Sequence, residues 1–325
     1  MPKVSIIIPT YNCAHFLREA IESALNQTYQ HIEIIVVDDG SSDGTKELLK
    51  GYQHGYPDKF RFYCQDNRGS SAARNLGIKN AEGEFIALLD SDDYWSSQKL
   101  KKQMTLFEED PQIAFSFTNA CILKNGHMTG NYVRADESEL IKGELFYDLF
   151  FRNFIPFSSV VFKKSIINEI GLLDETLWSI QDFEWLLRVI RHYKIRYIDE
   201  CLVTYRVHNT NISKHMEIRH KEGLEVLKRT IAQYPELKQK LGKRLIRLLA
   251  DKYFYFGYAL FDKNHIKESR EQFLNAIRTD PCYSYKPFLY FGMGLLPSSS
   301  IKNLRKWKQR LQNLLFFKAK SLKSV

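Results

Sequence analysis

Apolar and polar residues alternate in blocks along the first hundred positions. Four blocks are rich in β-branched or aromatic residues and predict buried strands, at 3–9 (KVSIIIP), 32–39 (IEIIVVDD), 59–65 (KFRFYCQ) and 83–90 (GEFIALLD). Between them, residues 14–27 have apolar side chains at helical spacing, and residues 67–81 run from a loop into a helix. Strands that are apolar almost throughout and alternate with helices predict a parallel sheet covered on both faces.

The rest of the chain predicts a less regular middle and a helical end. Three strands and one amphipathic helix are predicted in the middle, at 113–123, 155–164, 196–208 (a strand or a hairpin) and 181–193. Three helices are predicted after them, at 221–234, 243–265 and 266–281, the last two resembling one tetratricopeptide-like helix pair. Charge divides the chain at about the same place, since residues before Lys214 sum to −6 and residues from Lys214 onward to +15. We therefore expect two regions, 1–213 and 214–325.

Composition argues against several classes of protein. No apolar run reaches the roughly 18 residues of a membrane-spanning helix, and the first residues follow a strand pattern instead of that of a signal peptide. The five cysteines are scattered and form no C-x-x-C pair, which favours free thiols over a disulfide framework or a thiolate zinc site. We therefore expect a globular protein of the reducing cytoplasm.

Polar residues gather directly after the predicted strands. The segments are PTYN (9–12), VDDGSSDG (37–44), QDNRGSS (65–71) and LDSDD (89–93). In a parallel sheet these strand ends meet at one edge, where ligands bind. The last segment holds three carboxylates, which repel one another unless a positive charge lies between them. A divalent cation, Mg²⁺ or Mn²⁺, would supply that charge together with a place for substrate phosphates. A solvated turn that caps the next helix is the alternative.

These motifs, in this order, resemble the inverting glycosyltransferases of family 2, which have the GT-A fold. The resemblance covers roughly residues 3–213, from VSIIIPTYN through VDDGSSDGT, NRGSSAARNLG and LLDSDDYW to QDFEWLL and YRVHNTNIS. It implies an α/β fold of the GT-A (Rossmann-like) type, with a mostly parallel sheet and helices on both faces, followed by an α-helical C-terminal region. It also implies that 1–213 binds a nucleotide-sugar and carries the catalytic residues.

The aspartate cluster matches the stretch that this family uses to bind metal. The resemblance implies that Asp92 is a direct ligand of Mn²⁺ or Mg²⁺ and that Asp90 lies beside the metal, near the ribose or the sugar. Asp93 is expected to cap the following helix. His208 is a candidate third metal ligand or diphosphate contact, and a structural loop histidine is the alternative.

Nucleotide-sugar contacts are expected at the other strand ends. Tyr11, two residues after Pro9, offers a flat ring on which a base can stack. The resemblance implies that Asp39 accepts the N3–H of uracil. The third loop and its helix add residues that allow close backbone approach or pair with a diphosphate, namely Asn67, Gly69 and Arg74. An ordinary tyrosine, a turn-capping aspartate and a surface arginine are the alternatives.

Asp182 matches the catalytic acidic position of the family, at the start of the predicted helix 181–193. An inverting transfer needs one base to take the proton of the acceptor hydroxyl. The commonest form of the motif has Glu before this Asp, whereas this chain has Gln181, which leaves the base in place but removes a neighbouring charge. A simple helix cap is the alternative for Asp182.

The resemblance implies a metal-dependent, inverting glycosyltransferase of polysaccharide biosynthesis. It would move a sugar from a nucleotide-sugar donor, UDP-linked, to a hydroxyl of a glycan or lipid-linked glycan acceptor. Two alternatives remain open. A catalytically silent nucleotide-sugar-binding or scaffold protein is one, because Gln181 departs from the motif. A sugar-phosphate nucleotidyltransferase is the other, although the chain has no Gly-rich, Lys-containing loop after its first strand.

The end of the chain is strongly basic. Residues 302–325 contain eight Lys or Arg and no acid, interleaved with large apolar side chains. A basic amphipathic helix resting on the anionic cytoplasmic face of a membrane is one interpretation, and a solvated terminal helix is another. We do not expect nucleic-acid binding, because no nucleic-acid motif accompanies the charge.

Overall fold

The computed structural model describes residues 1–133, 145–209, 211, 215–282 and 284–296. The chain divides into two compact units, Met1–Lys214 and His215–Val325, which are considered separately below. Within the described ranges, no helix has both the length and the apolar character needed to cross a membrane. The basic segment 302–325 lies outside the described residues, so its predicted contact with a membrane stays a prediction.

The first unit is built on one mostly parallel sheet. Among the described residues, nine strands follow the order β3-β2-β1-β4-β8-β6-β9-β5, with β7 beside β6. Pairs β1–β2, β1–β4, β2–β3 and β6–β9 are parallel, while β8, β5 and β7 join antiparallel. The strands are β1 Val4–Thr10, β2 Ile32–Asp38, β3 Phe60–Cys64, β4 Phe85–Leu88, β5 Tyr94–Trp95, β6 Ile113–Lys124, β7 His127–Asn131, β8 Val161–Lys163 and β9 Lys194–Val207.

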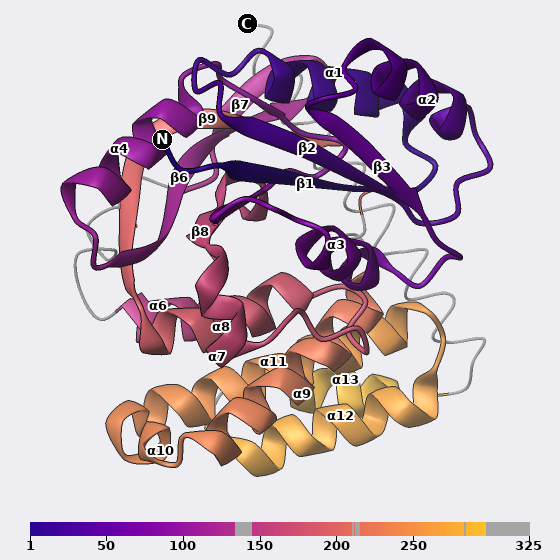
Figure 1. Cartoon of the computed structure of the whole chain (residues 1–325). Helices are drawn as coiled ribbons and strands as arrows, with labels where there is room; N and C mark the ends of the chain where they lie inside the picture. Colours follow the sequence, from indigo (N-terminus) through magenta and orange to yellow (C-terminus); the bar gives the residue numbers. More distant parts are fainter. Residues whose placement is uncertain (134–144, 210, 212–214, 283, 297–325) are drawn as a thin grey trace, which may run out of the picture. The chain divides into compact units, whose positions relative to one another are not determined.

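Helices cover both faces of this sheet, which explains why β1 is buried throughout. Figure 1 shows α1 and α2 over one face and α3 over the other. Ile6 and Ile8 share a core cluster with α1, and Ile7 faces α3, where a Cβ on Gly77 would lie 2.5 Å from the Ile7 side chain. Glycine at that position lets the helix lie close against the strand. The helices of the unit are α1 Ala14–Leu25, α2 Thr45–Gly55, α3 Ser70–Lys79, α4 Lys99–Glu109, α6 Leu145–Phe151, α7 Ile167–Ile170 and α8 Gln181–His192.

Two predicted strands differ from the structure. The predicted strand 155–164 contains only β8, because Phe157–Ser159 forms a short 3-10 turn, η2, after Pro156. Proline has no N–H for a strand ladder, and the turn aims the Ser158 hydroxyl at the carboxylate cluster. The predicted strand or hairpin at 196–208 is a single long strand, β9, parallel to β6.

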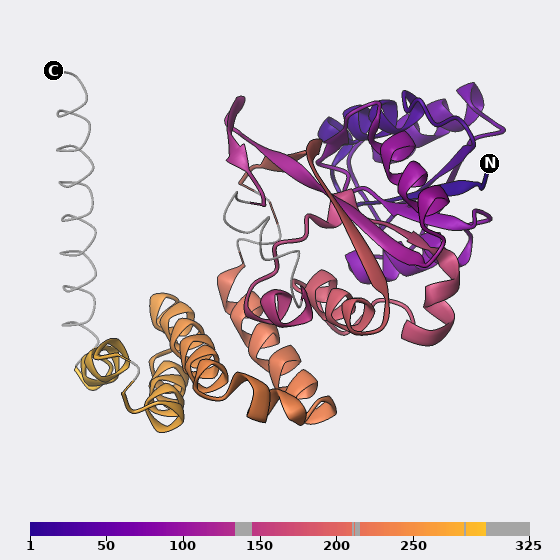
Figure 2. The same cartoon turned by 90° about the vertical axis from the view of Figure 1, so that its left-hand side faces the viewer.

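The second unit is helical and its helices pack in chain order. Helix α9 packs on α11, α11 on α12, and α12 on α13, and Figures 1 and 2 show α11 and α12 side by side. Gly257 in α11 lies against the ring of Phe273 in α12, as in the predicted tetratricopeptide-like pair. The helices are α9 Met216–Gln233, α10 Glu236–Leu241, α11 Lys243–Asp262, α12 Ile266–Thr279 and α13 Lys286–Met293.

Candidate active site

Neighbouring parallel strands bring the predicted binding segments to one edge of the sheet. Thr10 at the end of β1 is the register partner of Asp38 at the end of β2, and Asp38 is the partner of Cys64 at the end of β3. Ile7 of β1 pairs with Leu88, so the turn that follows β4 begins at the same edge. The four polar segments therefore start beside one another, as the parallel topology requires.

Asp39 holds the third loop in place. Its carboxylate is buried and accepts hydrogen bonds from Gln65 Nε2 (2.7 Å), the Arg68 backbone N (2.9 Å) and the Gly69 backbone N (2.8 Å). Gly69 has φ = 91°, a backbone conformation that side chains disfavour. The predicted contact between Asp39 and uracil stays a prediction, while the observed contacts make Asp39 the residue that orders the loop before α3.

Two of the predicted donor contacts are open to solvent and one is not. The Tyr11 side chain is 50% exposed directly after β1, and Asn67 is exposed on the third loop. Pro9 is buried inside β1 opposite Val37. Pro9 therefore fixes the strand end from which Tyr11 projects, and Tyr11 and Asn67 can meet a ligand directly.

Arg74 is buried next to Asp90 and does not lie on the surface of the site. The Arg74 side chain is 6% exposed. Its guanidinium donates to Asp90 Oδ1 at 2.5 Å and lies over the Phe157 ring, with Cζ 5.2 Å from the ring centroid. The alternative of a surface arginine is therefore wrong. Arg74 neutralises Asp90 from below, and its Nε and Nη1 have no hydrogen-bond partner among the described residues.

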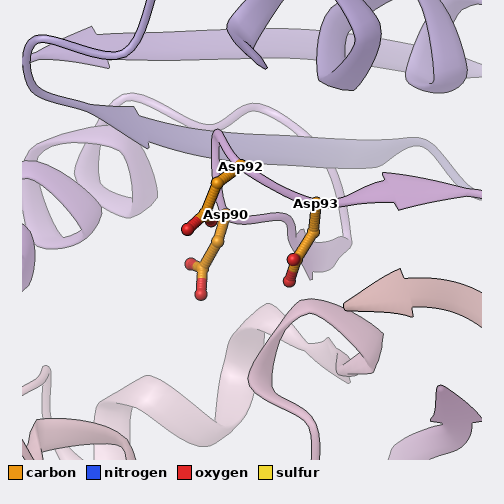
Figure 3. A group of neighbouring side chains, drawn as sticks. All are labelled: Asp90, Asp92 and Asp93. Atoms are coloured by element: carbon orange, nitrogen blue, oxygen red, sulfur yellow. The ribbon is translucent and has the colours of Figure 1, made fainter. Parts of the chain in front are cut away.

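Three carboxylates converge on the turn after β4. Figure 3 shows Asp90, Asp92 and Asp93 projecting toward the same side, and each offers an oxygen within 4.8 Å of the others. Asp90 and Asp92 are partly exposed, whereas Asp93 is buried. The three carboxylates are therefore close enough together to bind one metal ion.

Asp93 has a different role from the predicted helix cap. Helix α4 begins at Lys99, and the Asp93 carboxylate instead accepts hydrogen bonds from Ser158 Oγ (2.5 Å) and the Arg206 backbone N (2.9 Å). Burial raises the pKa of the Asp93 carboxyl well above its usual range, and the neighbouring charges of Asp92 and Asp90 raise it further. The prediction of a cap was wrong: Asp93 joins η2 and β9 to the turn.

Asp92 is the carboxylate that His208 reaches. His208 Nε2 lies 2.8 Å from Asp92 Oδ2, and Asn211 Nδ2 donates to the same oxygen at 3.1 Å. Asn211 Oδ1 in turn accepts from the His208 backbone N at 2.6 Å, and the Phe16 ring packs against the imidazole with centroids 4.9 Å apart. These contacts place the two predicted metal ligands, Asp92 and His208, side by side.

Asp182 lies in the first turn of α8, and the first residue of α8, Gln181, contacts the first residue of α3, Ser70. Gln181 Nε2 donates to Ser70 Oγ at 2.9 Å, and Asn153 Nδ2 donates to Asp182 Oδ2 at 2.9 Å. The carboxylate is therefore held by a side chain from outside its own helix. Gln181, the departure from the family motif, uses its amide to join α8 to the N-terminus of α3, a contact for which glutamate has no donor.

Two contributors escaped the sequence analysis. Ser158 binds Asp93, and Asn211 binds both Asp92 and His208. Asn211 stands three residues after His208 in a polar run, which is the signal that could have drawn attention to it. Ser158 gives no local signal, because its segment has the pattern of a strand.

The donor set suits a hard divalent cation. Carboxylate oxygens from Asp90 and Asp92 are partly exposed at the cluster, and a histidine nitrogen lies beside them. Mg²⁺ and Mn²⁺ prefer oxygen ligands and leave coordination positions for phosphates and water. The residues present therefore fit the ion that the carboxylate pattern predicts.

Fold and site together define the class of the protein as a glycosyltransferase with the GT-A fold. A family model described as Glycosyl transferase family 2 matches residues 5–171, about half of the chain. The chain belongs to this family, which confirms the predicted family, fold and enzyme class.

Curated relatives agree with this assignment. The chain is 31% identical over 256 residues to the putative teichuronic acid biosynthesis glycosyltransferase TuaG of Bacillus subtilis, covering 75% of this chain and 98% of TuaG. It is 34% identical over 218 residues to the Escherichia coli UDP-Glc:alpha-D-GlcNAc-diphosphoundecaprenol beta-1,3-glucosyltransferase WfaP. This match covers 66% of this chain and 80% of WfaP. An uncharacterized glycosyltransferase of Rickettsia felis is 33% identical over 229 residues, but the match spans 70% of this chain and 37% of that relative.

Solved structures show the same fold. S. aureus TarS 1–349 in complex with UDP has a TM-score of 0.61 at 20% identity, covering 90% of each chain. The mannosyltransferase PcManGT from Pyrobaculum calidifontis, in complex with GDP-Man and Mn²⁺, has a TM-score of 0.58 at 17% identity, covering 95% of this chain and 83% of that one.

Proposed function

We propose that the chain is a metal-dependent, inverting glycosyltransferase that moves a sugar from a UDP-sugar to a hydroxyl of a glycan or lipid-linked glycan. One observation carries the proposal: the strand-end cluster of Asp90 and Asp92, flanked by His208, at the edge where Tyr11 and the third loop emerge. The catalytic unit is 1–213, and 214–325 is an accessory helical region.

The donor nucleotide is inferred from relatives and from the loop geometry. TarS has been solved with UDP and with UDP-GlcNAc, and WfaP uses UDP-Glc. PcManGT shows that the same fold also accepts GDP-Man, so the fold alone does not choose the base. We assign base stacking to Tyr11 and contacts with the donor to Asn67 and the backbone of Gly69.

Asp92, Asp90 and His208 would hold the metal. Bound Mn²⁺ or Mg²⁺ supplies positive charge that stabilises the diphosphate leaving group. Arg74 balances the charge of Asp90 from the buried side, and Asn211 orients both Asp92 and His208. These contacts hold the partly exposed carboxylates of Asp90 and Asp92 in place for the metal.

Asp182 serves as the base. An inverting displacement removes a proton from the acceptor hydroxyl while its oxygen attacks the anomeric carbon, and the Asp182 carboxylate takes that proton. Its position in the first turn of α8 stabilises negative charge through the helix dipole. The hydrogen bond from Asn153 fixes one oxygen of this carboxylate.

The acceptor class is inferred from the named relatives. TuaG belongs to teichuronic acid biosynthesis, and WfaP acts on a GlcNAc-diphosphoundecaprenol. Both are glycan-building reactions, and the second uses a lipid-linked acceptor. A glycan or lipid-linked glycan hydroxyl is therefore the acceptor that we propose.

A donor panel tests the proposal. Purified full-length protein is incubated with UDP- and GDP-sugars, with Mn²⁺, with Mg²⁺ or with EDTA, and both thermal stabilisation and release of nucleoside diphosphate are measured. We expect stabilisation and release with a UDP-sugar and metal, and loss of both with EDTA. Binding without turnover on any acceptor would support a silent binding protein, and equal binding in EDTA would exclude the metal role.

A further inference from the structure

Helix α13 is the last helix of the second unit within the described residues, and its outer face is apolar. In α13 and its adjoining turns, the large exposed side chains are Tyr285, Phe288, Leu289, Leu295 and Leu296, which are 43–73% exposed. Tyr285, Phe288 and Leu289 are three or four residues apart and share one side of the helix, where a surface helix normally carries polar groups, and Leu295 and Leu296 follow in the turn after it. We call these five residues the α13 face.

The opposite side of α13 is firmly packed, so the helix cannot turn its apolar face inward. The Tyr290 ring lies among the rings of Phe254, Phe261 and Phe273, with centroids 5.7–5.8 Å apart. Gly294 lies against Arg270, whose Cγ would be 2.8 Å from a Cβ at that position. The exposure of the α13 face is therefore a consequence of how α12 and α13 pack.

Helices α11, α12 and α13 stack in chain order, and such stacks need a polar outer face on their last helix to stay soluble. The α13 face does not provide one. Contiguous exposed apolar side chains of this kind mark a site that contacts a partner or a membrane.

Charge identifies the partner. Residues 297–325, which follow α13 directly, contain eight Lys or Arg and no Asp or Glu, and the region from Lys214 onward sums to +15. A second copy would bring the same positive charge against it, which is unfavourable. An anionic bilayer offers negative headgroups for the basic residues and an apolar interior for the α13 face.

We propose that the α13 face binds the surface of an anionic lipid membrane, with Phe288 and Leu289 entering the boundary between headgroups and acyl chains. The net positive charge of the region from Lys214 onward attracts the headgroups and brings the face to the surface. This interaction does not depend on sugar transfer, so it stands or falls separately from the proposed function. With a lipid-linked acceptor, it would hold the enzyme where its substrate is anchored.

Vesicle cosedimentation of the full chain tests the proposal. The variants are Phe288→Ser with Leu289→Ser, and Ile246→Ser as a matched control, because Ile246 is an exposed apolar residue of α11 in the same unit. On phosphatidylcholine vesicles containing phosphatidylglycerol, we expect the double variant to lose about tenfold or more in partitioning, which corresponds to about 1.4 kcal/mol. The control should bind like the wild type, and vesicles of phosphatidylcholine alone should bind all three proteins weakly.

A second pair of variants keeps the test decisive if the first fails to fold. Leu295→Ser with Leu296→Ser should reduce binding similarly, and Phe288→Trp should give a blue-shifted fluorescence component on anionic vesicles that Ile246→Trp does not give. Unchanged vesicle binding in both double variants would overturn the proposal. If the double variants instead convert a dimer to a monomer in sedimentation velocity, the α13 face binds a second copy and the proposal is overturned. If they lower the Tm while vesicle binding stays unchanged, the α13 face serves internal packing, which also overturns the proposal.

Discussion

Replacing Asp182 with asparagine separates catalysis from donor binding. Asparagine has nearly the same size and keeps a side-chain oxygen that can accept the 2.9 Å hydrogen bond from Asn153. It cannot take a proton from the acceptor hydroxyl. The variant therefore removes the proposed base while retaining the contact that positions it.

The size of the effect follows from the role. A positioned general base contributes about 10²–10⁴-fold to the rate, which is about 2.7–5.4 kcal/mol of barrier at 1.36 kcal/mol per tenfold change. We expect Asp182→Asn to lower kcat by that factor. The Kd for the nucleotide-sugar should stay near the wild-type value, because the groups proposed to bind the donor lie at the strand ends and on the third loop.

The assay measures kcat for transfer to the acceptor with Mn²⁺ and, separately, Kd by calorimetry. Glu184→Gln is the matched control, since Glu184 is also acidic, lies in the same helical turn, and pairs with Arg188 at 2.8 Å within α8. We expect that control to keep kcat within a few-fold. An Asp182→Asn enzyme with kcat within a few-fold of wild type would refute the assignment of the base, and an equal loss in donor affinity would move Asp182 into the donor site.

Three further predictions concern single residues. Asp92→Asn should abolish metal-dependent binding of the nucleotide-sugar with the fold intact; calorimetry that shows unchanged metal-dependent affinity would exclude Asp92 as a ligand. Asn211→Ala removes the hydrogen bonds to Asp92 and His208 and should weaken Mn²⁺ affinity by about 10–100-fold, the usual effect of losing a partner of a metal ligand; a Mn²⁺ titration of thermal stability checks this. Burial, followed by nearby Lys252 and Arg219, lowers the pKa of His220 to about 4, below the usual 6.5. The folded second unit therefore binds that proton less readily than the unfolded chain, so its stability should fall as the pH drops from about 6.5 toward 4, by about 1–2 kcal/mol after allowance for partial exposure. His220→Phe should flatten this dependence in thermal melts, and an unchanged pH profile would contradict the inference.

Several features of the fold could be predicted because they are written in local patterns. The run SIIIP in β1 predicts a strand buried on both faces, and the structure packs Ile6 against α1 and Ile7 against α3. The prediction failed at 155–164, where Pro156 starts a turn that local apolarity does not reveal. Hydrophobic pattern reports burial well, but it does not report which buried backbone lacks a ladder partner.

The site shows the same division between local and distant causes. The types of residue were evident, since three aspartates after a strand predict a cation and an acidic residue at a helix start predicts a base. Their partners were not evident. Asp93 was predicted to cap the next helix, but it binds Ser158 and Arg206, which are 65 and 113 residues away in the sequence.

The sequence by itself determined the alternation of strands and helices in the first hundred residues, the family, and the chemistry available at each strand end. Only the tertiary structure decided that Arg74 lies beneath Asp90, that His208 reaches Asp92 across 116 residues, and that Gln181 joins α8 to Ser70 across 111. The reason is physical. Periodicity and motif chemistry act over a few residues, whereas these contacts depend on β9 and α8 being placed beside the strand-end edge, and that placement is set by the packing of the whole sheet and its core.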